Sequence, residues 1–296
     1  MNSERKVNGF TMERPSAVMY GAASTALVVA ALRAIETASN APLFTDPFAA
    51  RLVHAARMVR PLPTHPDQVG EEDRVLFQLA VDSAALRTRY LDDYLTGSPA
   101  PQVVILAAGL DTRSFRLDWP PGCRVFELDR APVMEFKQKA LDGTGARASC
   151  DRRPVAVDLR DDWEAALTEA GFDPSQPTAW LIEGLLPYLP ASAEERLFDA
   201  VHRLSAAGSS IGVWAMAQDT QSAGAPDRRL SAMYAAFGID ITDIANTEPR
   251  RSIIEHLPSL AWKVKENTMD DLSKHYQRAL PSSRRRITFF TAQNSF

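Results

Sequence analysis

The sequence predicts an α/β protein built on a doubly wound, Rossmann-like parallel sheet of about seven strands. Short apolar runs alternate with helical segments through the middle of the chain, which is typical of parallel strands joined by crossover helices. The run from Val103 to Ala108 contains no polar residue, as expected for a strand that is buried on both faces. Several of the runs end at a glycine or an acidic residue, where ligands bind in sheets of this kind.

The composition is that of a globular protein that can bury a large core. The chain has 296 residues, of which 45% are hydrophobic and 24% charged, and its formal net charge is −4 at pH 7. This charge favours neither nucleic acid nor an anionic membrane as a partner. The apolar run from Ala26 to Leu32 ends at Arg33 and is too short for a membrane span or an export signal, so we expect a cytoplasmic protein. Cys123 and Cys150 lack metal-ligand spacing, and we expect no metal.

Residues 1–98 are predicted to form a helical region that packs on the sheet. Helical spacing indicates helices over residues 16–38 and 71–95, and the pair Asp46-Pro47 indicates the start of another helix between them. The last helix carries Arg87 and Arg89 shortly before the first strand. An arginine here could bind a carboxylate through two hydrogen bonds, or it could lie on a solvated helix face.

Residues 99–296 are predicted to form the ligand-binding domain. The expected strands cover residues 103–108, 125–128, 154–157, 178–182, 211–214, 262–264 and 287–291. The pattern of strands and helices loosens over residues 215–258. We interpret this segment as an insertion that covers a pocket.

A nucleoside site is predicted between Gly109 and Asp129. The glycine follows the first strand, and the acid ends the second strand about twenty residues later, the spacing at which an acid can bind ribose hydroxyls. A dinucleotide site would need further glycines around the pyrophosphate, whereas here the loop continues as Leu-Asp-Thr-Arg. Asp111 also adds a negative charge to that loop. These features favour S-adenosylmethionine, which carries an ammonium and a sulfonium but no phosphate, over a dinucleotide. Gly109 alone could also be an ordinary strand turn, but the two acids Asp111 and Asp129 favour a nucleoside site.

Acidic residues mark the ends of several predicted strands. Asp111, Asp129, Asp158 and Glu183 join Gly109 in following four different strands. Because the carboxyl ends of parallel strands meet at one edge of the sheet, we expect these side chains to face a ligand or cationic partners there. Asp158 could instead cap the helix that follows it.

The segments AAGLDTRSFRL, FELDRAPV, VDLRDDW and LIEGLLPYL resemble the leucine carboxyl methyltransferase family, particularly its actinobacterial and polyketide O-methyltransferase branch. The segments TALVVAALRAIE, LFTDPFAARL and RTRYLDDYL resemble it too, so the likeness covers nearly the whole chain. The resemblance implies a class I, S-adenosylmethionine-dependent methyltransferase fold with an N-terminal helical region and a substrate-capping insertion. Residues 215–258 depart from the family pattern, so the resemblance does not identify the substrate.

The resemblance also implies roles for individual residues. Arg89 matches the arginine that holds the methionine carboxylate, and Gly109 matches the glycine of the first loop. Asp129 matches the acid that binds the ribose hydroxyls. Asp158 and the backbone of Leu159 match the adenine contacts, and Glu183 matches the acid near the methionine amino group.

The methyl acceptor can be narrowed by acid–base chemistry. A carboxylate is ionised at neutral pH and needs no general base, whereas a phenol or alcohol usually benefits from one. The five histidines lie outside the motifs at the strand ends, which favours a carboxylate acceptor. The candidates for binding it are Arg113, Arg250 or Arg251 to position the carboxylate, Tyr20 and Tyr188 to line the pocket, and His256 as a base if the acceptor is a hydroxyl.

Four functions are therefore open. The favoured one is an O-methyltransferase that acts on a small molecule, such as a polyketide or another secondary metabolite. A protein C-terminal carboxylate is an alternative acceptor. A non-catalytic S-adenosylmethionine-binding protein is a third possibility, and an NAD-dependent oxidoreductase is disfavoured by the missing glycines and by Asp111.

Overall fold

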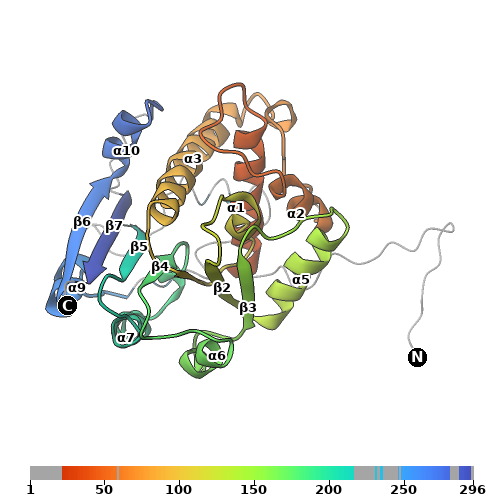
Figure 1. The fold of residues 1–296 in the computed structure, drawn as a ribbon. Helices are drawn as coiled ribbons and strands as arrows, with labels where there is room; N and C mark the ends of the chain where they lie inside the picture. Colours follow the sequence, from red (N-terminus) through yellow and green to blue (C-terminus); the bar gives the residue numbers. More distant parts are fainter. Residues whose placement is uncertain are drawn as a thin grey trace, which may run out of the picture.

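The computed structural model describes residues 22–58, 60–216, 231, 234–235, 246, 248–280 and 287–294. It contains a seven-stranded sheet flanked by helices, which confirms the predicted fold class (Figure 1). The strands are β1 (Gln102–Leu106), β2 (Arg124–Asp129), β3 (Asp151–Ala156), β4 (Thr178–Ile182), β5 (Ser210–Met216), β6 (Trp262–Thr268) and β7 (Ile287–Asn294). Their order in the sheet is β3-β2-β1-β4-β5-β7-β6. Strands β1 to β5 are parallel, and β7 lies antiparallel between β5 and β6.

Three of the described α-helices precede β1, and the others lie between the strands. The α-helices are α1 (Ala22–Thr37), α2 (Ala49–Ala55), α3 (Arg74–Thr96), α4 (Arg113–Arg116), α5 (Ala131–Asp142), α6 (Trp163–Glu169), α7 (Ala191–Arg203), α9 (Ile253–Ser259) and α10 (Met269–His275), with the 3₁₀ turns η1 (Pro66–Gln68) and η2 (Leu186–Tyr188). None of the helices within the described ranges combines the length and the apolar character needed to cross a membrane.

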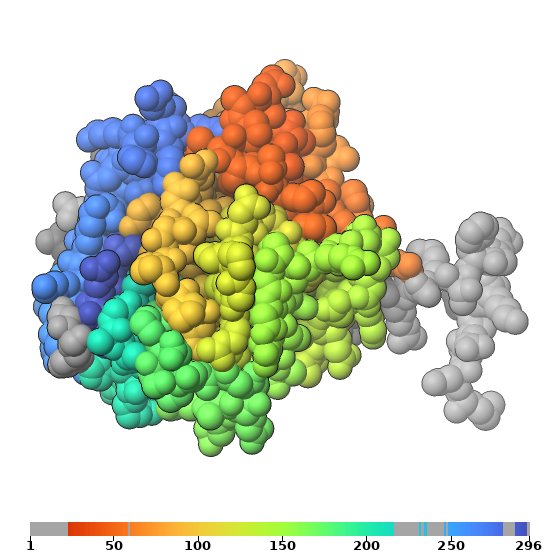
Figure 2. Space-filling view, viewed as in Figure 1, coloured from red at the N-terminus to blue at the C-terminus, as the bar shows by residue number. Residues whose placement is uncertain are grey.

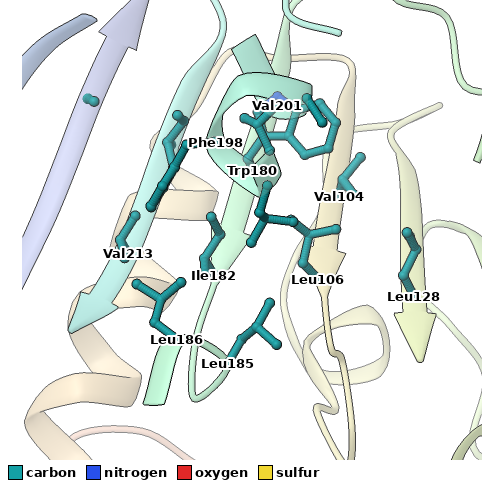
Figure 3. Packing of buried hydrophobic residues seen from close by; sticks show 14 of the residues in the cluster. Val104, Leu106, Leu128, Trp180, Ile182, Leu185, Leu186, Phe198, Val201 and Val213 are labelled. Atoms are coloured by element: carbon teal, nitrogen blue, oxygen red, sulfur yellow. The ribbon is translucent and has the colours of Figure 1, made fainter. Parts of the chain in front are cut away.

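One face of the sheet is covered by α6, α7 and α9. Trp180 and Ile182 of β4 and Val104 of β1 point toward Phe198 and Val201 of α7, and all five side chains are buried (Figure 3). Their contacts explain why β1 and β4 have apolar residues at successive positions, because the other face is covered as well.

The second face packs against α3. Leu91 and Leu95 of this helix contact a buried cluster that includes Val103 and Ile105 of β1 and Leu181 of β4. The helix is therefore fixed to the centre of the sheet, and its register determines which of its side chains reach the carboxyl ends of the strands.

The helices before β1 join the loop that follows β1. In Figure 2 the red and orange N-terminal helices pack directly against the rest of the molecule. Asp46, which is 2% exposed, accepts hydrogen bonds from Arg33 Nε at 2.8 Å and from Thr112 Oγ1 at 2.7 Å. Arg33 Nη2 also donates to the carbonyl oxygen of Leu110 at 2.7 Å. The loop at residues 110–112 is thus bonded to the N-terminal helices.

All seven strands lie where the sequence predicts them, but the two edge strands are longer than predicted, and so is the interior strand β7, which ends at Asn294 rather than near residue 291. β3 begins at Asp151 rather than near residue 154, and β6 extends to Thr268 rather than ending near residue 264. The additional segments of the edge strands are DRR and KENT, which are charged or polar because an edge strand has solvent beside it. An apolar run is therefore a poor marker of an edge strand.

Candidate active site

The loop after β1 brings Gly109 and Asp129 into direct contact. The Gly109 N–H donates to Asp129 Oδ2 at 2.7 Å, and the Arg130 N–H donates to Asp129 Oδ1 at 2.7 Å. Gly109 has a φ of +48°, which a glycine adopts without the steric cost that a Cβ would add. Ala107 also has a positive φ, +54°, so the chain turns sharply at the end of β1.

The carboxyl group of Asp129 is largely buried, which disfavours its ionised form. Burial raises the pKa of its carboxyl above the ordinary value, and the hydrogen bonds from Gly109 and Arg130 only partly offset that effect. Each of its oxygens already accepts one backbone N–H, and a carboxylate oxygen can accept further bonds. Asp129 can therefore bind a pair of ligand hydroxyl groups.

A second group of charged residues lies at the ends of β1 and β4. Arg113, which is 3% exposed, donates through Nη1 to Glu183 Oε2 at 2.8 Å and to Asp111 Oδ2. Burial opposes ionisation of Asp111, but attraction to Arg113 dominates the sum of charges around it and lowers its pKa to about 2. Asp111 is thus neutralised within the protein. The contact of Asp111 with the cofactor stays a prediction.

Arg87 completes this group, whereas the family resemblance implies Arg89. The Arg87 Nε lies 2.8 Å from Glu183 Oε1, and its guanidinium lies 5.0 Å from the centroid of the Trp214 ring. The buried Nε has no aligned hydrogen-bond acceptor, so this contact is an ion pair whose N–H is not directed at the carboxylate. Arg87 therefore retains hydrogen-bonding capacity for an anionic ligand group.

Arg89 contacts the other side of α3. Its Nε donates to Asp93 Oδ1 at 2.9 Å, its Nη1 donates to the Leu43 carbonyl oxygen at 3.0 Å, and its guanidinium lies over the Tyr276 ring. Two residues apart on a helix point in nearly opposite directions. The Asp93 partner one turn later was the signal in the sequence that Arg89 belongs to the outer face.

Asp158 and Leu159 follow β3 as predicted, next to the end of β2. The Val157 N–H donates to the Asp129 carbonyl oxygen at 2.9 Å, which fixes this loop beside Asp129. The Asp158 carboxylate accepts hydrogen bonds from the backbone and side chain of Arg160, and the side-chain bonds are the main cause that lowers its pKa to about 2. Leu159 packs against the edge of the core. Their contact with adenine stays a prediction.

Two tyrosines lie near Arg87. The Tyr188 hydroxyl in η2 donates to Thr25 Oγ1 in α1 at 3.0 Å. Burial raises the pKa of Tyr188, and burial together with the nearby Tyr188 raises that of Tyr234. Tyr234 is 8% exposed and belongs to the predicted insertion. The sequence predicts no role for Tyr234, since neither spacing nor a motif distinguishes it.

The remaining candidates lie apart from these acids or outside the described residues. His256 in α9 faces α7, with Nε2 3.3 Å from Asp199 Oδ1. Arg250 pairs with Glu194 and donates to the carbonyl oxygens of Leu186 and Leu189. These bonds connect the C-terminal end of the predicted insertion to η2. Arg251 Nη2 donates to the Glu255 carbonyl oxygen at 3.4 Å. Tyr20 lies outside the described residues. Within the described ranges, no group of three or more His, Cys, Asp or Glu side chains could hold a metal ion.

Comparison with known proteins identifies the class and then the family. A candidate methyltransferase of Thermobifida fusca has a crystal structure that matches with a TM-score of 0.51, at 17% identity, over 83% of this chain and 94% of that one. The fold is therefore that of a methyltransferase. The sequence model for leucine carboxyl methyltransferase matches residues 26–202. The chain belongs to the leucine carboxyl methyltransferase family.

Relatives in actinobacteria support the same assignment. A candidate S-adenosyl-L-methionine-dependent methyltransferase of Saccharopolyspora erythraea is 42% identical over 266 residues, which are 89% of this chain and 91% of that protein. One from Mycobacterium avium is 45% identical over 251 residues, covering 81% and 79%. These findings confirm the predicted family and the predicted enzyme class, an S-adenosylmethionine-dependent methyltransferase.

Proposed function

We propose that this protein transfers a methyl group from S-adenosylmethionine to an oxygen of a small molecule, with a carboxylate as the favoured acceptor and a hydroxyl as the other. The observation that supports it best is the pairing of Gly109 with Asp129 beside the ion pair of Arg87 with Glu183. The first pair suits a ribose. The second offers one group of each charge, which suits the amino-acid end of the cofactor. A secondary metabolite as substrate and a cytoplasmic location remain predictions.

We propose which residue binds each part of the cofactor. We place the ribose hydroxyls at Asp129, beside Gly109, and the adenine at Asp158 and the Leu159 backbone. We place the ammonium of the cofactor at Glu183. The carboxylate goes to Arg87 in place of Arg89, because Arg87 contacts Glu183 and its buried Nε lacks an aligned acceptor, whereas Arg113, which also contacts Glu183, is held by two further carboxylates.

Methyl transfer from this site requires alignment more than acid–base chemistry. S-adenosylmethionine supplies an electrophilic methyl group on its sulfonium. The protein contributes by holding the acceptor oxygen in line with that group and by excluding water. Because their pKa values are raised, Tyr188 and Tyr234 stay protonated at neutral pH, so they can donate a hydrogen bond to an acceptor but cannot remove its proton. Such a site suits an acceptor that is already ionised.

Arg113 is better suited to hold Glu183 than to bind the acceptor, since three carboxylates surround its buried guanidinium. Tyr188 remains the candidate for lining the acceptor pocket. Tyr234, which belongs to the predicted insertion, is a second candidate.

A binding experiment tests the cofactor assignment. Titration calorimetry should give micromolar binding of S-adenosylmethionine and S-adenosylhomocysteine by the wild type, and Asp129→Asn should weaken both at least about tenfold because ribose binding loses an ionised acceptor. Each oxygen of Asp129 accepts a backbone N–H and an asparagine has only one side-chain oxygen, so the substitution should also lower the stability of the ligand-free protein, by about 1–3 kcal/mol. Asp142→Asn, at an exposed position of α5, is the matched control. Equal affinity of both variants for the two ligands would show that Asp129 does not bind the ribose.

A transfer assay then tests the acceptor class. Radiolabelled methyl transfer is measured against aromatic and aliphatic carboxylic acids, phenols, and a peptide that ends in leucine, the last because of the family's description. We expect turnover with small carboxylates. Turnover with the peptide alone would establish protein carboxyl methylation instead, and cofactor binding without turnover on any acceptor would favour a non-catalytic role.

A further inference from the structure

A buried carboxylate is connected through one arginine to the proposed cofactor contact Glu183. Asp92 in α3 is 5% exposed. Its Oδ1 accepts hydrogen bonds from Arg113 Nε at 2.7 Å and from Arg116 Nη2 at 2.8 Å, and its Oδ2 accepts one from Arg116 Nη1 at 2.6 Å. Such charge-assisted bonds are strong and directional, so Asp92 fixes the planes of two guanidinium groups.

Arg113 connects Asp92 to the strand ends. Its Nε is bound to Asp92, while its Nη1 donates to Glu183 and to Asp111. The guanidinium is rigid and planar, so fixing the Nε edge also fixes the direction of Nη1. The position of the Glu183 carboxylate therefore depends on a residue that lies too deep to contact the cofactor itself.

The charges in this cluster are balanced. Its carboxylates are Asp92, Asp111 and Glu183, and its guanidinium groups are Arg87, Arg113 and Arg116. Neutralising Asp92 would leave an excess positive charge in a buried region. That charge would oppose the arrival of an ammonium group at Glu183, because charges in such surroundings are poorly screened.

We propose that Asp92 is a positioning residue for the methyl-transfer reaction, which acts through Arg113 to orient Glu183 and to keep its surroundings receptive to the ammonium group of the cofactor. The inference rests on the proposed function, since it takes Glu183 as the contact for that ammonium. It predicts that Asp92 affects the amino-acid end of the cofactor and leaves the nucleoside end alone.

Asp82 provides a matched control on the same helix. It is 7% exposed and accepts a hydrogen bond from Arg278 Nη1 at 2.9 Å, so its burial and its pairing resemble those of Asp92. Arg278, however, continues to Glu36 in α1 and not to a strand end. Asp82→Asn should therefore reproduce the loss of a buried ion pair without any effect on the cofactor.

The experiment compares two ligands that differ only at the amino-acid end. S-adenosylhomocysteine has the ammonium and carboxylate groups, and 5′-methylthioadenosine lacks both. We expect Asp92→Asn to weaken S-adenosylhomocysteine at least about tenfold in titration calorimetry while 5′-methylthioadenosine binds as to the wild type. We expect Asp82→Asn to change neither affinity, although both variants should melt at lower temperature than the wild type.

Arg113→Lys gives a second test that keeps the charge. A lysine cannot bridge Asp92 and Glu183 with a planar fork, so this variant should show the same selective loss of S-adenosylhomocysteine. If Asp92→Asn does not fold, the affinities of Arg113→Lys for the two ligands test the proposal. Equal losses for both ligands, or unchanged affinity in a folded variant, would overturn the role of Asp92 while the cofactor site stands. Absence of S-adenosylhomocysteine binding by the wild type would instead refute the proposed function.

Discussion

Asp111 shows that a single neighbouring residue can decide what a charged side chain does. The sequence predicts that its negative charge faces the ligand, and in the structure its carboxylate accepts hydrogen bonds from the backbone and the side chain of Arg113, two residues later. Burial alone would raise the pKa of Asp111, yet its attraction to Arg113 and to more distant cations lowers it to about 2. The residue therefore contributes to stability in its ionised form.

The stability contribution of Asp111 should depend on pH in a defined direction. Since its pKa in the folded protein is below the ordinary value of 3.8, ionised Asp111 stabilises the fold fully above about pH 4 and loses this effect as the pH falls toward 2. Asp111→Asn should lower the free energy of unfolding by on the order of 2 kcal/mol at pH 7. The difference from the wild type should shrink between about pH 4 and pH 2. Urea unfolding at several pH values measures it, and a difference that is constant with pH would contradict this explanation.

The candidate site could be predicted only where a residue's role depends on its place along the chain. Gly109, Asp129 and Glu183 each follow a strand, and the strands were recognisable from their apolar runs. The choice between Arg87 and Arg89 depends instead on the rotation of α3 about its axis, which is set by the packing of Leu91 and Leu95 against the sheet. Tyr234 was out of reach for a similar reason, because its position depends on long-range packing.

At the scale of elements, α3 lies very close to the sheet at Gly212 in β5. A Cβ at this position would lie 2.5 Å from Cε1 of Tyr94. Tyr94 cannot easily move, since its hydroxyl donates to the Trp180 carbonyl oxygen at 3.1 Å and lies 2.9 Å from Ser210 Oγ. The absence of a side chain at residue 212 is thus what allows the helix to lie this close to the sheet.

Gly212→Ala should therefore be costly. Accommodating the methyl group requires α3 or the Tyr94 ring to shift, and we expect a loss of about 1–3 kcal/mol in the free energy of unfolding. Gly143→Ala is the control, because a Cβ there meets only the flexible end of Arg51 and the backbone φ is −80°. Chemical denaturation of both variants measures the difference. If Gly212→Ala is as stable as its control, the packing of α3 on β5 is loose enough to accept a methyl group, and this explanation fails.

Elements in the middle of the sheet were predictable because they are buried on both faces, which requires apolar residues at successive positions. The edge strands β3 and β6 were only half recognised, since they carry charges beside solvent. Segment composition therefore predicts the centre of an α/β sheet better than its margins.

At the scale of the whole molecule, the N-terminal helices and the sheet share hydrogen bonds at the ligand loop. Asp46 contacts Arg33 on one side and Thr112 on the other. Asp46→Ala leaves the buried Arg33 without its carboxylate, and we expect it to lower the free energy of unfolding by about 3 kcal/mol. Because Thr112 also loses its acceptor, the variant should show a smaller rise in melting temperature with S-adenosylhomocysteine than the wild type.

Thermal melts with and without the ligand check both effects. Asp67→Ala, at a position where the side chain is 89% exposed, serves as the control and should behave as the wild type. A normal ligand-induced rise in the Asp46 variant would show that the N-terminal helices stabilise the protein without supporting the ligand loop.

The antiparallel placement of β7 has a consequence for biosynthesis. During translation β5 emerges first and β6 follows, but the two cannot join, because the position between them is reserved for residues 287–294. Until those residues leave the ribosome, β5 keeps an open edge and β6 has no partner in the sheet. Completion of the sheet therefore falls after translation of the seventh strand, and a nascent chain stalled before it would expose that edge to chaperones and to other chains.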